Sequence, residues 1–131
     1  MAKLERLRMM SISYNEITGT LPSEIATMRH INFIDLEGNS LQGTIPHEWF
    51  HSNVADFITI ALGYNQISGT IPTDIQKWTS MNRLLLEHNR LTGTIPTELF
   101  ALSFLGKLSM PRQKGGNKTA FLFLLFNLVF S

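Results

Sequence analysis

The chain has 131 residues and a formal net charge of +1, and apolar residues make up 44% of it. This length suits one folded domain with a modest core, and the composition is globular rather than disordered. A charge so close to neutral argues against nucleic acid as a partner. The lack of cysteine excludes disulfides, cysteine-ligated zinc and thiol nucleophiles.

The N-terminus reads MAKLERLRMMSISYNE, with charges through its first eight residues and no unbroken apolar run. A secretory signal needs such an apolar run, so this segment does not form one. The sequence alone therefore leaves the compartment unknown.

Four segments of the chain share one pattern, and each is centred on an asparagine. These asparagines follow one another at spacings of 24, 26 and 24 residues: Asn15, Asn39, Asn65 and Asn89. Apolar residues recur three, five, eight and eleven positions before each asparagine and two positions after it. Gly, Thr and Pro follow at four, five and seven positions after it. We call the segments coils one to four; their glycines and prolines would break any continuous amphipathic helix.

Within each coil, the apolar residues five and three positions before the asparagine alternate as a strand with one buried face requires. A single coil cannot bury that face, so the coils must stack and align their strands in a parallel sheet. We expect strands near residues 10–12, 34–36, 60–62, 84–86 and 108–110. The asparagine amide both donates and accepts, so a buried column of these side chains can satisfy backbone groups between coils. After each proline, a polar residue and an acid indicate a short helical start.

This pattern resembles the leucine-rich repeat family, in the subtype of plant and algal receptor-like proteins, L-x-x-L-x-x-L-x-L-x-x-N-x-L-x-G-x-I-P. The resemblance covers residues 4 to about 110. It implies an α/β repeat fold: a right-handed solenoid with a parallel concave β-sheet and short turns of helix on the convex side. We expect a repeat domain over residues 1–112, with four full coils and a partial fifth, and a non-repeat tail over 113–131. The fifth coil is partial because Gln113 replaces its asparagine, although four core positions are still filled by Leu102, Leu105, Leu108 and Met110.

The stretch HEWFH, residues 47–51, matches the H-E-x-x-H pattern, in which two histidines on a helix bind zinc and the glutamate is a general base. The repeat offers another explanation, because Glu48 occupies an acidic position and Trp49 a core position that every coil has. A zinc protease also needs a longer helix and a third ligand. We therefore expect His47 and His51 at the surface, no catalytic activity, no metal and no cofactor, with weak adventitious metal binding as the alternative.

Residues that alternate with the buried pair of each strand point outward, and the resemblance implies that the concave face is the recognition surface. The candidate ligand-binding residues are Tyr14, Phe33, Asp35, Glu37, Tyr64, Arg83, Glu87 and His88. Exposed aromatic residues with a few charges are typical of a protein or peptide contact. The same positions face solvent in any such solenoid, so an ordinary solvated face is the other interpretation.

The C-terminal part differs from the repeats in charge and composition. The balance is −3 up to Glu98 and +4 after it, and AFLFLLFNLVF, residues 120–130, is almost wholly apolar. As a helix, these eleven residues would span about 16 Å, too short for a hydrocarbon core of about 30 Å. Three interpretations stay open: a cover for the last coil, a truncated membrane segment that gives membrane association, or a gene-model artefact that replaces further coils.

The resemblance implies a non-catalytic binding module that recognises a protein, peptide or glycan through its concave face. The alternative is the ectodomain fragment of a leucine-rich repeat receptor-like kinase, whose membrane and kinase parts are missing from this chain. Either function implies an extracellular or plasma-membrane location.

Overall fold

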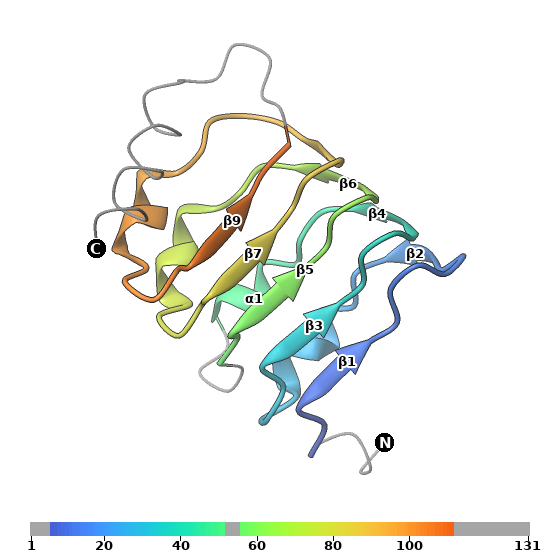
Figure 1. The fold of residues 1–131 in the computed structure, drawn as a ribbon, viewed down its shortest axis with the longest axis horizontal. Helices are drawn as coiled ribbons and strands as arrows, with labels where there is room; N and C mark the ends of the chain where they lie inside the picture. Colours follow the sequence, from blue (N-terminus) through green and yellow to red (C-terminus); the bar gives the residue numbers. More distant parts are fainter. Residues whose placement is uncertain (1–5, 52–55, 112–131) are drawn as a thin grey trace.

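The computed structural model describes residues 6–51 and 56–111. The chain winds through successive coils, and each coil adds one strand to a five-stranded parallel sheet (Figure 1). These strands lie side by side in chain order and are β1 (Met9–Ser11), β3 (Phe33–Asp35), β5 (Thr59–Ala61), β7 (Arg83–Leu85) and β9 (Lys107–Ser109). The expected solenoid with its parallel sheet is confirmed.

Each strand is centred about one residue earlier than the sequence predicts. The prediction placed the last strand residue three positions before the asparagine, as at Leu36, whereas β3 ends at Asp35. Leu36 is still 4% exposed, and its N–H donates to the carbonyl of Ala61 at 2.9 Å. The core position was therefore predicted correctly, and only the boundary of the regular pairing differs.

A second parallel sheet, which the sequence did not predict, lies just beyond the asparagines. It is made of β2 (Thr18–Thr20), β4 (Ser40–Gly43), β6 (Gln66–Gly69) and β8 (Arg90–Leu91). The repeat glycine falls within or beside these strands with positive φ, 79° at Gly43 and 85° at Gly69. Because the coils have nearly the same length, these segments stay in register from coil to coil. Their backbones can therefore pair although each strand is short and mostly polar.

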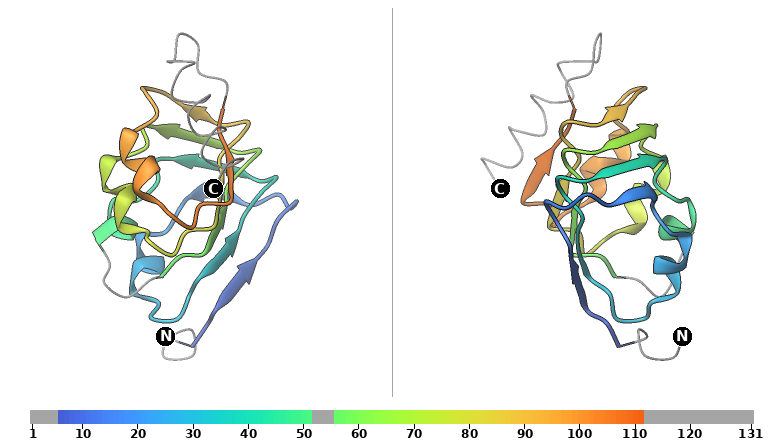
Figure 2. Two further views of the ribbon diagram at one scale, coloured as in Figure 1. Left: turned by 60° about the vertical axis from the view of Figure 1, so that its left-hand side comes forward. Right: turned by 90° about the vertical axis from the view of Figure 1, so that its right-hand side faces the viewer.

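The convex side carries one helical turn per coil, each beginning just after a repeat proline. Three are 3₁₀ turns, η1 (Ser23–Thr27), η2 (Thr73–Lys77) and η3 (Thr97–Ala101), and the fourth is α1 (Glu48–His51). Each has an acid in its first turn. Figure 2 shows the solenoid from the side, with the first sheet and the helical turns on opposite sides. These turns confirm the prediction for the segments after the prolines.

The core lies between the sheets and the helical turns. Ile34, Ile60 and Leu84 each have 0% exposure at the centre of their strands. In the fifth coil, Leu102 and Leu105 are buried, while Leu108 and Met110 are partly buried against the same core. These residues pack on the repeat core, and β9 adds their strand to the first sheet. The tail prediction for residues 113–131 falls outside the described residues.

The repeat asparagines link neighbouring coils as expected. Asn65 donates from Nδ2 to the carbonyls of Leu36, Leu62 and Gly63 at 3.0 to 3.1 Å, and its Oδ1 accepts from the N–H of Leu41 at 3.0 Å. Asn39 and Asn89 repeat this arrangement toward the coil before each of them. One side chain thus satisfies backbone groups of two coils at once.

The prediction of one uniformly buried column is wrong at Asn15. Asn39 and Asn65 are 9% and 8% exposed and Asn89 is half-buried, but Asn15 is exposed. Among the described residues, its Nδ2 donates only to carbonyls of its own coil, those of Ile12 and Ser13. In the described part of the chain no coil lies before coil one, so half of the arrangement is missing there.

Candidate recognition surface

Strand register places the outward side chains of the first sheet in columns across the coils. One column is Met9, Phe33, Thr59, Arg83 and Lys107, and the next is Ser11, Asp35, Ala61, Leu85 and Ser109. The first four members of each column are outward positions of coils one to four, which the alternation along each strand predicted. The prediction missed Lys107 and Ser109, although they lie at the same positions of the partial fifth coil. Counting the repeat phase past the fourth coil would have found them.

The candidate residues differ in exposure. Tyr14, Tyr64, Arg83 and His88 are exposed, whereas Phe33, Asp35, Glu37 and Glu87 are partly buried. Some outward positions in the middle of the face are closed to solvent: Thr59, Ala61, Gly63 and Leu85. The expectation that the whole alternating set faces solvent is therefore wrong for these four residues. The accessible groups lie mainly along the edges of the face.

Asp35 is held by hydrogen bonds within the face. Ser11 and Ser13 donate from their hydroxyls to Oδ2 of Asp35 at 3.4 and 3.1 Å. The backbone N–H of Glu37 donates to the other oxygen, Oδ1, at 3.2 Å. This carboxylate is therefore fixed in place across coils one and two, and its partners are uncharged.

The residue just before each asparagine forms the rim of the face, and we call this set the rim row: Tyr14, Gly38, Tyr64 and His88. All four have left-handed backbone angles, with φ between 51° and 66°. The turn that brings the asparagine into the coil therefore needs this conformation in every coil. Glycine adopts it without strain, but the other three are aromatic residues for which it is unfavourable.

Tyr14 extends over coil two. Its hydroxyl donates to Oε1 of Glu37 at 2.6 Å, and this hydrogen bond, with the nearby negative charge, raises the pKa of Tyr14 to about 12. A Cβ on Gly38 would come within 2.5 Å of Cδ1 of Tyr14. Gly38 is therefore required for two reasons, its backbone angle and the ring that lies on it. The phenol and the carboxylate form one polar unit on the rim.

Tyr64 and His88 form the second unit of the rim row. Their rings stack with centroids 4.3 Å apart and planes 19° from parallel. Beside them, the carboxyl carbon of Glu87 lies 3.1 Å from the position of a Cβ on Gly63, so a larger residue there would require the Glu87 side chain to shift slightly. Oε2 of Glu87 is buried and accepts no hydrogen bond from the described residues. Sequence reasoning placed these residues on one face but could not show the stack.

HEWFH lies on the convex side of coil two, away from this surface. Trp49 has 0% exposure, and its Nε1 donates to the carbonyl of Pro22 in coil one at 3.0 Å. His47 and His51 are exposed, and Nδ1 of His51 lies 3.0 Å from the carbonyl oxygen of His47. Nε2 of His51 also lies 3.7 Å from Oδ2 of Asp74. Among the described residues, no group of three or more His, Asp or Glu side chains is arranged to hold a metal ion.

Asp74 belongs to the same convex surface. Lys77 donates from Nζ to its Oδ1 at 2.7 Å, and this bond lowers the pKa of Asp74. The pair is exposed at the end of a helical turn, where an ion pair stabilises little. This part of the convex surface, across coils two and three, is thus a packed tryptophan flanked by solvated polar groups.

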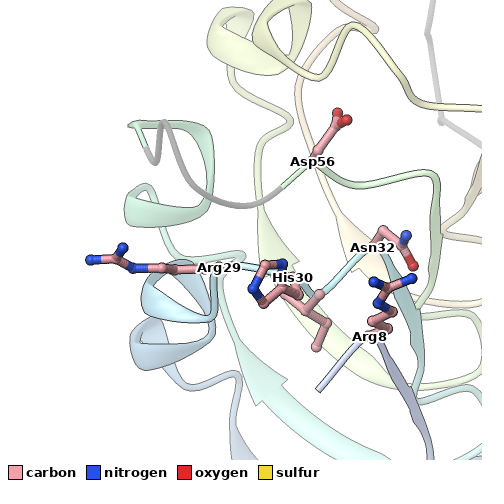
Figure 3. Close-up of a pocket in the computed structure, with 6 residues that line it drawn as sticks. Arg8, Arg29, His30, Asn32 and Asp56 are labelled. Carbon is pink, nitrogen blue, oxygen red and sulfur yellow. The ribbon is translucent and has the colours of Figure 1, made fainter. Parts of the chain in front are cut away.

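A hollow of about 200 Å³ lies where the chain enters the first strands, and no sequence pattern predicted it. It is lined by Arg8, Arg29, His30, Ile31, Asn32 and Asp56. Figure 3 shows the side chain of Arg29 directed away from the other labelled residues, and Asp56 lies apart from Arg8. The lining mixes both signs of charge, and its polar groups do not converge on one point.

Within residues 6–51 and 56–111, no helix has both the length and the apolar character to span a membrane. The apolar stretch at residues 120–130, for which the sequence suggested membrane association, lies outside the described residues.

The chain matches the family model described as Leucine Rich Repeat over residues 6–28, 30–52 and 80–102, more than half of its length. It therefore belongs to the leucine-rich repeat family, as the repeat pattern and the solenoid indicate. A comparison with curated protein sequences finds no significant match.

Solved structures with this fold include plant receptor ectodomains. The chain is similar to the complex of BIR3 and SERK2 from Arabidopsis thaliana, with a TM-score of 0.78 and 30% identity over 86% of this chain and 59% of that one. It is also similar to the Arabidopsis receptor kinase HAESA in complex with the peptide hormone IDA and the co-receptor SERK1, with a TM-score of 0.76 and 32% identity over 84% of this chain and 18% of that one.

A third similar structure is the plant peptide hormone receptor RGFR1 in complex with RGF2, with a TM-score of 0.74 and 30% identity. The match covers 84% of this chain and 17% of that one. The chain thus spans less than two thirds of each of these structures, and as little as 17% of one.

Proposed function

We propose that the chain is a non-catalytic recognition module that binds a peptide or protein through the concave face of its first sheet. Binding centres on the rim row and the neighbouring carboxylate Glu37. Phe33, Asp35, Arg83 and Glu87 complete the contact surface. Direct recognition of this kind needs no cofactor.

The backbone conformation of the rim row carries this proposal. Gly38 shows that glycine fits the left-handed turn, yet Tyr14, Tyr64 and His88 fill the same turn in the other coils. A left-handed backbone costs a residue with a side chain roughly 1–2 kcal/mol. Tyr14 and Tyr64 are 72% and 47% exposed, so their rings recover little of that cost by burial within the chain. Unfavourable backbone angles at exposed aromatic residues point to a functional contact.

The surface favours a peptide or protein ligand. Aromatic rings with both acids and bases nearby match the composition of protein contacts. Two similar structures, HAESA and RGFR1, are complexes with IDA, described as a peptide hormone, and with RGF2. A glycan is the alternative ligand class, because tyrosine rings also stack on sugars.

The second candidate function is that of an ectodomain fragment of a leucine-rich repeat receptor-like kinase. Its support is the similarity to the receptor kinase HAESA at 32% identity. An extracellular or plasma-membrane location follows from this candidate. We further propose that the repeat domain ends at residue 112 and that residues 113–131 are a separate tail.

Affinity selection can test the recognition function. Phage-displayed random peptides and an array of soluble oligosaccharides are each presented to the full chain, and enriched members are measured by calorimetry. Tyr64→Ala should weaken an enriched peptide about 30-fold, the loss that defines a binding hot spot. Gln76→Ala, an exposed change on the convex turn η2, is the matched control and should change affinity less than about 2-fold.

Equal binding by Tyr64→Ala and the parent chain would contradict a role for the rim row. Enrichment of oligosaccharides alone, with the same dependence on Tyr64, would replace the peptide by a glycan. Failure to enrich any ligand from either library would count against the recognition function.

A further inference from the structure

Glu37 and Glu87 occupy the same position of coils two and four, but their carboxylates are bonded differently. Oε1 of Glu37 accepts a hydrogen bond from the hydroxyl of Tyr14 at 2.6 Å. Oε2 of Glu87 is buried and accepts no hydrogen bond from any described residue. A buried carboxylate oxygen without a donor is unfavourable, because it has lost its contact with water and gained none in exchange. Within the described residues, Glu87 is therefore the carboxylate of the concave face that still needs a donor.

No described residue forms an ion pair with this carboxylate. The ion pairs within residues 6–51 and 56–111 lie on the convex side and involve Glu48 and Asp74. Arg83, at the start of β7, is four residues before Glu87, roughly 13 Å at the rise of a parallel strand. The edge of the concave face around Glu87 thus carries a negative charge that this part of the chain does not compensate.

The Glu87 carboxylate can be reached from the concave face. Its carboxyl carbon lies 3.1 Å from the position of a Cβ on Gly63, so the side chain extends over coil three, where glycine presents no side chain of its own. Glu87 as a whole is only partly buried. Rotation about its last side-chain bond exchanges the two oxygens at little cost. A donor that approaches the concave face can therefore meet either oxygen.

The aromatic stack of Tyr64 and His88 lies beside this carboxylate. Tyr64 donates its backbone N–H to the carbonyl of Glu87 at 2.9 Å, and His88 follows Glu87 in the chain. Both stacked residues are exposed. A cation is attracted to the face of an aromatic ring, and a planar guanidinium also stacks on it. The carboxylate and the stack together suit a positively charged group that donates hydrogen bonds.

We propose, on the basis of the peptide recognition proposed above, that Glu87 and the Tyr64–His88 stack select a positively charged side chain of the ligand, with arginine preferred to lysine. The guanidinium donates to the Glu87 carboxylate and lies against an outer face of the stack. Arginine is preferred because its planar group can make both contacts at once, whereas an ammonium is a compact point charge. Glu37 does not take this role, because Tyr14 already donates to it.

Three phage libraries test this specificity, each of random peptides with one fixed central residue: arginine, lysine or glutamine. With the full chain, enrichment should be strongest for arginine and weakest for glutamine. The most enriched arginine peptide and its glutamine counterpart are then measured by calorimetry. The parent chain should bind the arginine peptide about 10-fold more tightly, as expected for hydrogen bonds to a charged group.

Glu87→Gln keeps the shape of the side chain but removes its charge, so it should reduce this preference to less than about 2-fold. Glu37→Gln, the same change at the equivalent position of coil two, is the matched control and should leave the preference near 10-fold, whatever its effect on overall affinity. Thermal melts of both variants establish that they are folded.

A preference for arginine that survives Glu87→Gln, or that Glu37→Gln removes equally, would overturn this assignment. Equal enrichment from the three libraries would also overturn it, while peptide recognition by the concave face would stand. Enrichment from none of them would count against the recognition function itself and against the arginine site with it.

Discussion

The repeat asparagines and the rim row occupy adjacent positions in the chain but differ in almost every physical respect. Asn65 is 8% exposed and bonded to coils two and three, while Tyr64, one residue earlier, is 47% exposed and stacked on His88. The left-handed turn at the rim residue produces this change of direction within one residue. Side chains in the rim row can therefore vary without disturbing the bonds that hold the coils together.

The largest effect is expected inside the solenoid, at Trp49. Trp49→Ala removes a ring with 0% exposure that packs against Phe57 at a centroid distance of 5.7 Å. The cavity between coils two and three should cost about 3–5 kcal/mol of unfolding free energy. Trp49→Phe is the matched control; it keeps most of the apolar volume but leaves the carbonyl of Pro22 without its donor, so it should cost clearly less. Urea denaturation of both variants measures this, and equal losses would show that the cavity is not the cause.

Gly38→Ala tests whether the rim row depends on its backbone angles. With φ at 66° and Cδ1 of Tyr14 only 2.5 Å from the new Cβ, the change should cost about 1–2 kcal/mol. It should also displace Tyr14 from Glu37. Thermal melts give the loss, and Gly106→Ala serves as the control, because the nearest atom to its Cβ is 3.2 Å away and its φ is not left-handed. A neutral Gly38→Ala would mean that the rim is freely adjustable.

The double variant His47→Ala, His51→Ala tests whether the histidines of HEWFH are simple surface residues on the convex side. Both side chains are exposed, so the double variant should change unfolding free energy by less than about 0.5 kcal/mol. Calorimetric titration with zinc should show weak binding or none, because two imidazoles provide only half of a tetrahedral site. Submicromolar zinc affinity that disappears in the double variant would contradict this assignment.

Tyr14 should lose its proton at an unusually high pH for a tyrosine. Its hydrogen bond to Glu37 raises the pKa to about 12, above the value of about 10 for a free phenol. Because the folded-state pKa is the higher one, its stabilising contribution is complete below pH 10 and is lost as pH rises toward 12. Tyrosinate absorbance in a Tyr64→Phe background reports Tyr14 alone, and Glu37→Ala should return the pKa toward 10. An unchanged pKa in Glu37→Ala would show that Glu37 is not the cause.

Much of the fold could be predicted because the regular spacing of the repeat determines how the coils align. The spacing of the asparagines fixed which residues share a column, and the register of Met9, Phe33 and Thr59 follows that spacing. The position of Trp49 could be predicted because every coil has an apolar residue there. The second sheet was missed because its strands are short polar bends whose pairing depends on alignment between coils.

The candidate surface was predicted in position but not in detail. The sequence placed Ala61 and Leu85 among outward residues, and it carried no signal that they would be 5% and 6% exposed. Nor did it show that Tyr14 would bond Glu37, since that contact depends on a left-handed turn. Asn15 was predicted to be buried because its residue type matches the repeat, but burial depends on a neighbouring coil.

The most direct test of the central claim compares two adjacent substitutions, Asn65→Ala and Tyr64→Ala. Asn65 holds the interface between coils, and the role proposed for Tyr64 is recognition. Asn65→Ala leaves buried backbone groups unpaired and should cost about 1–3 kcal/mol in urea denaturation. Tyr64→Ala removes an exposed ring and should stay within about 0.5 kcal/mol. A stability loss for Tyr64→Ala that equals or exceeds the loss for Asn65→Ala would contradict the account.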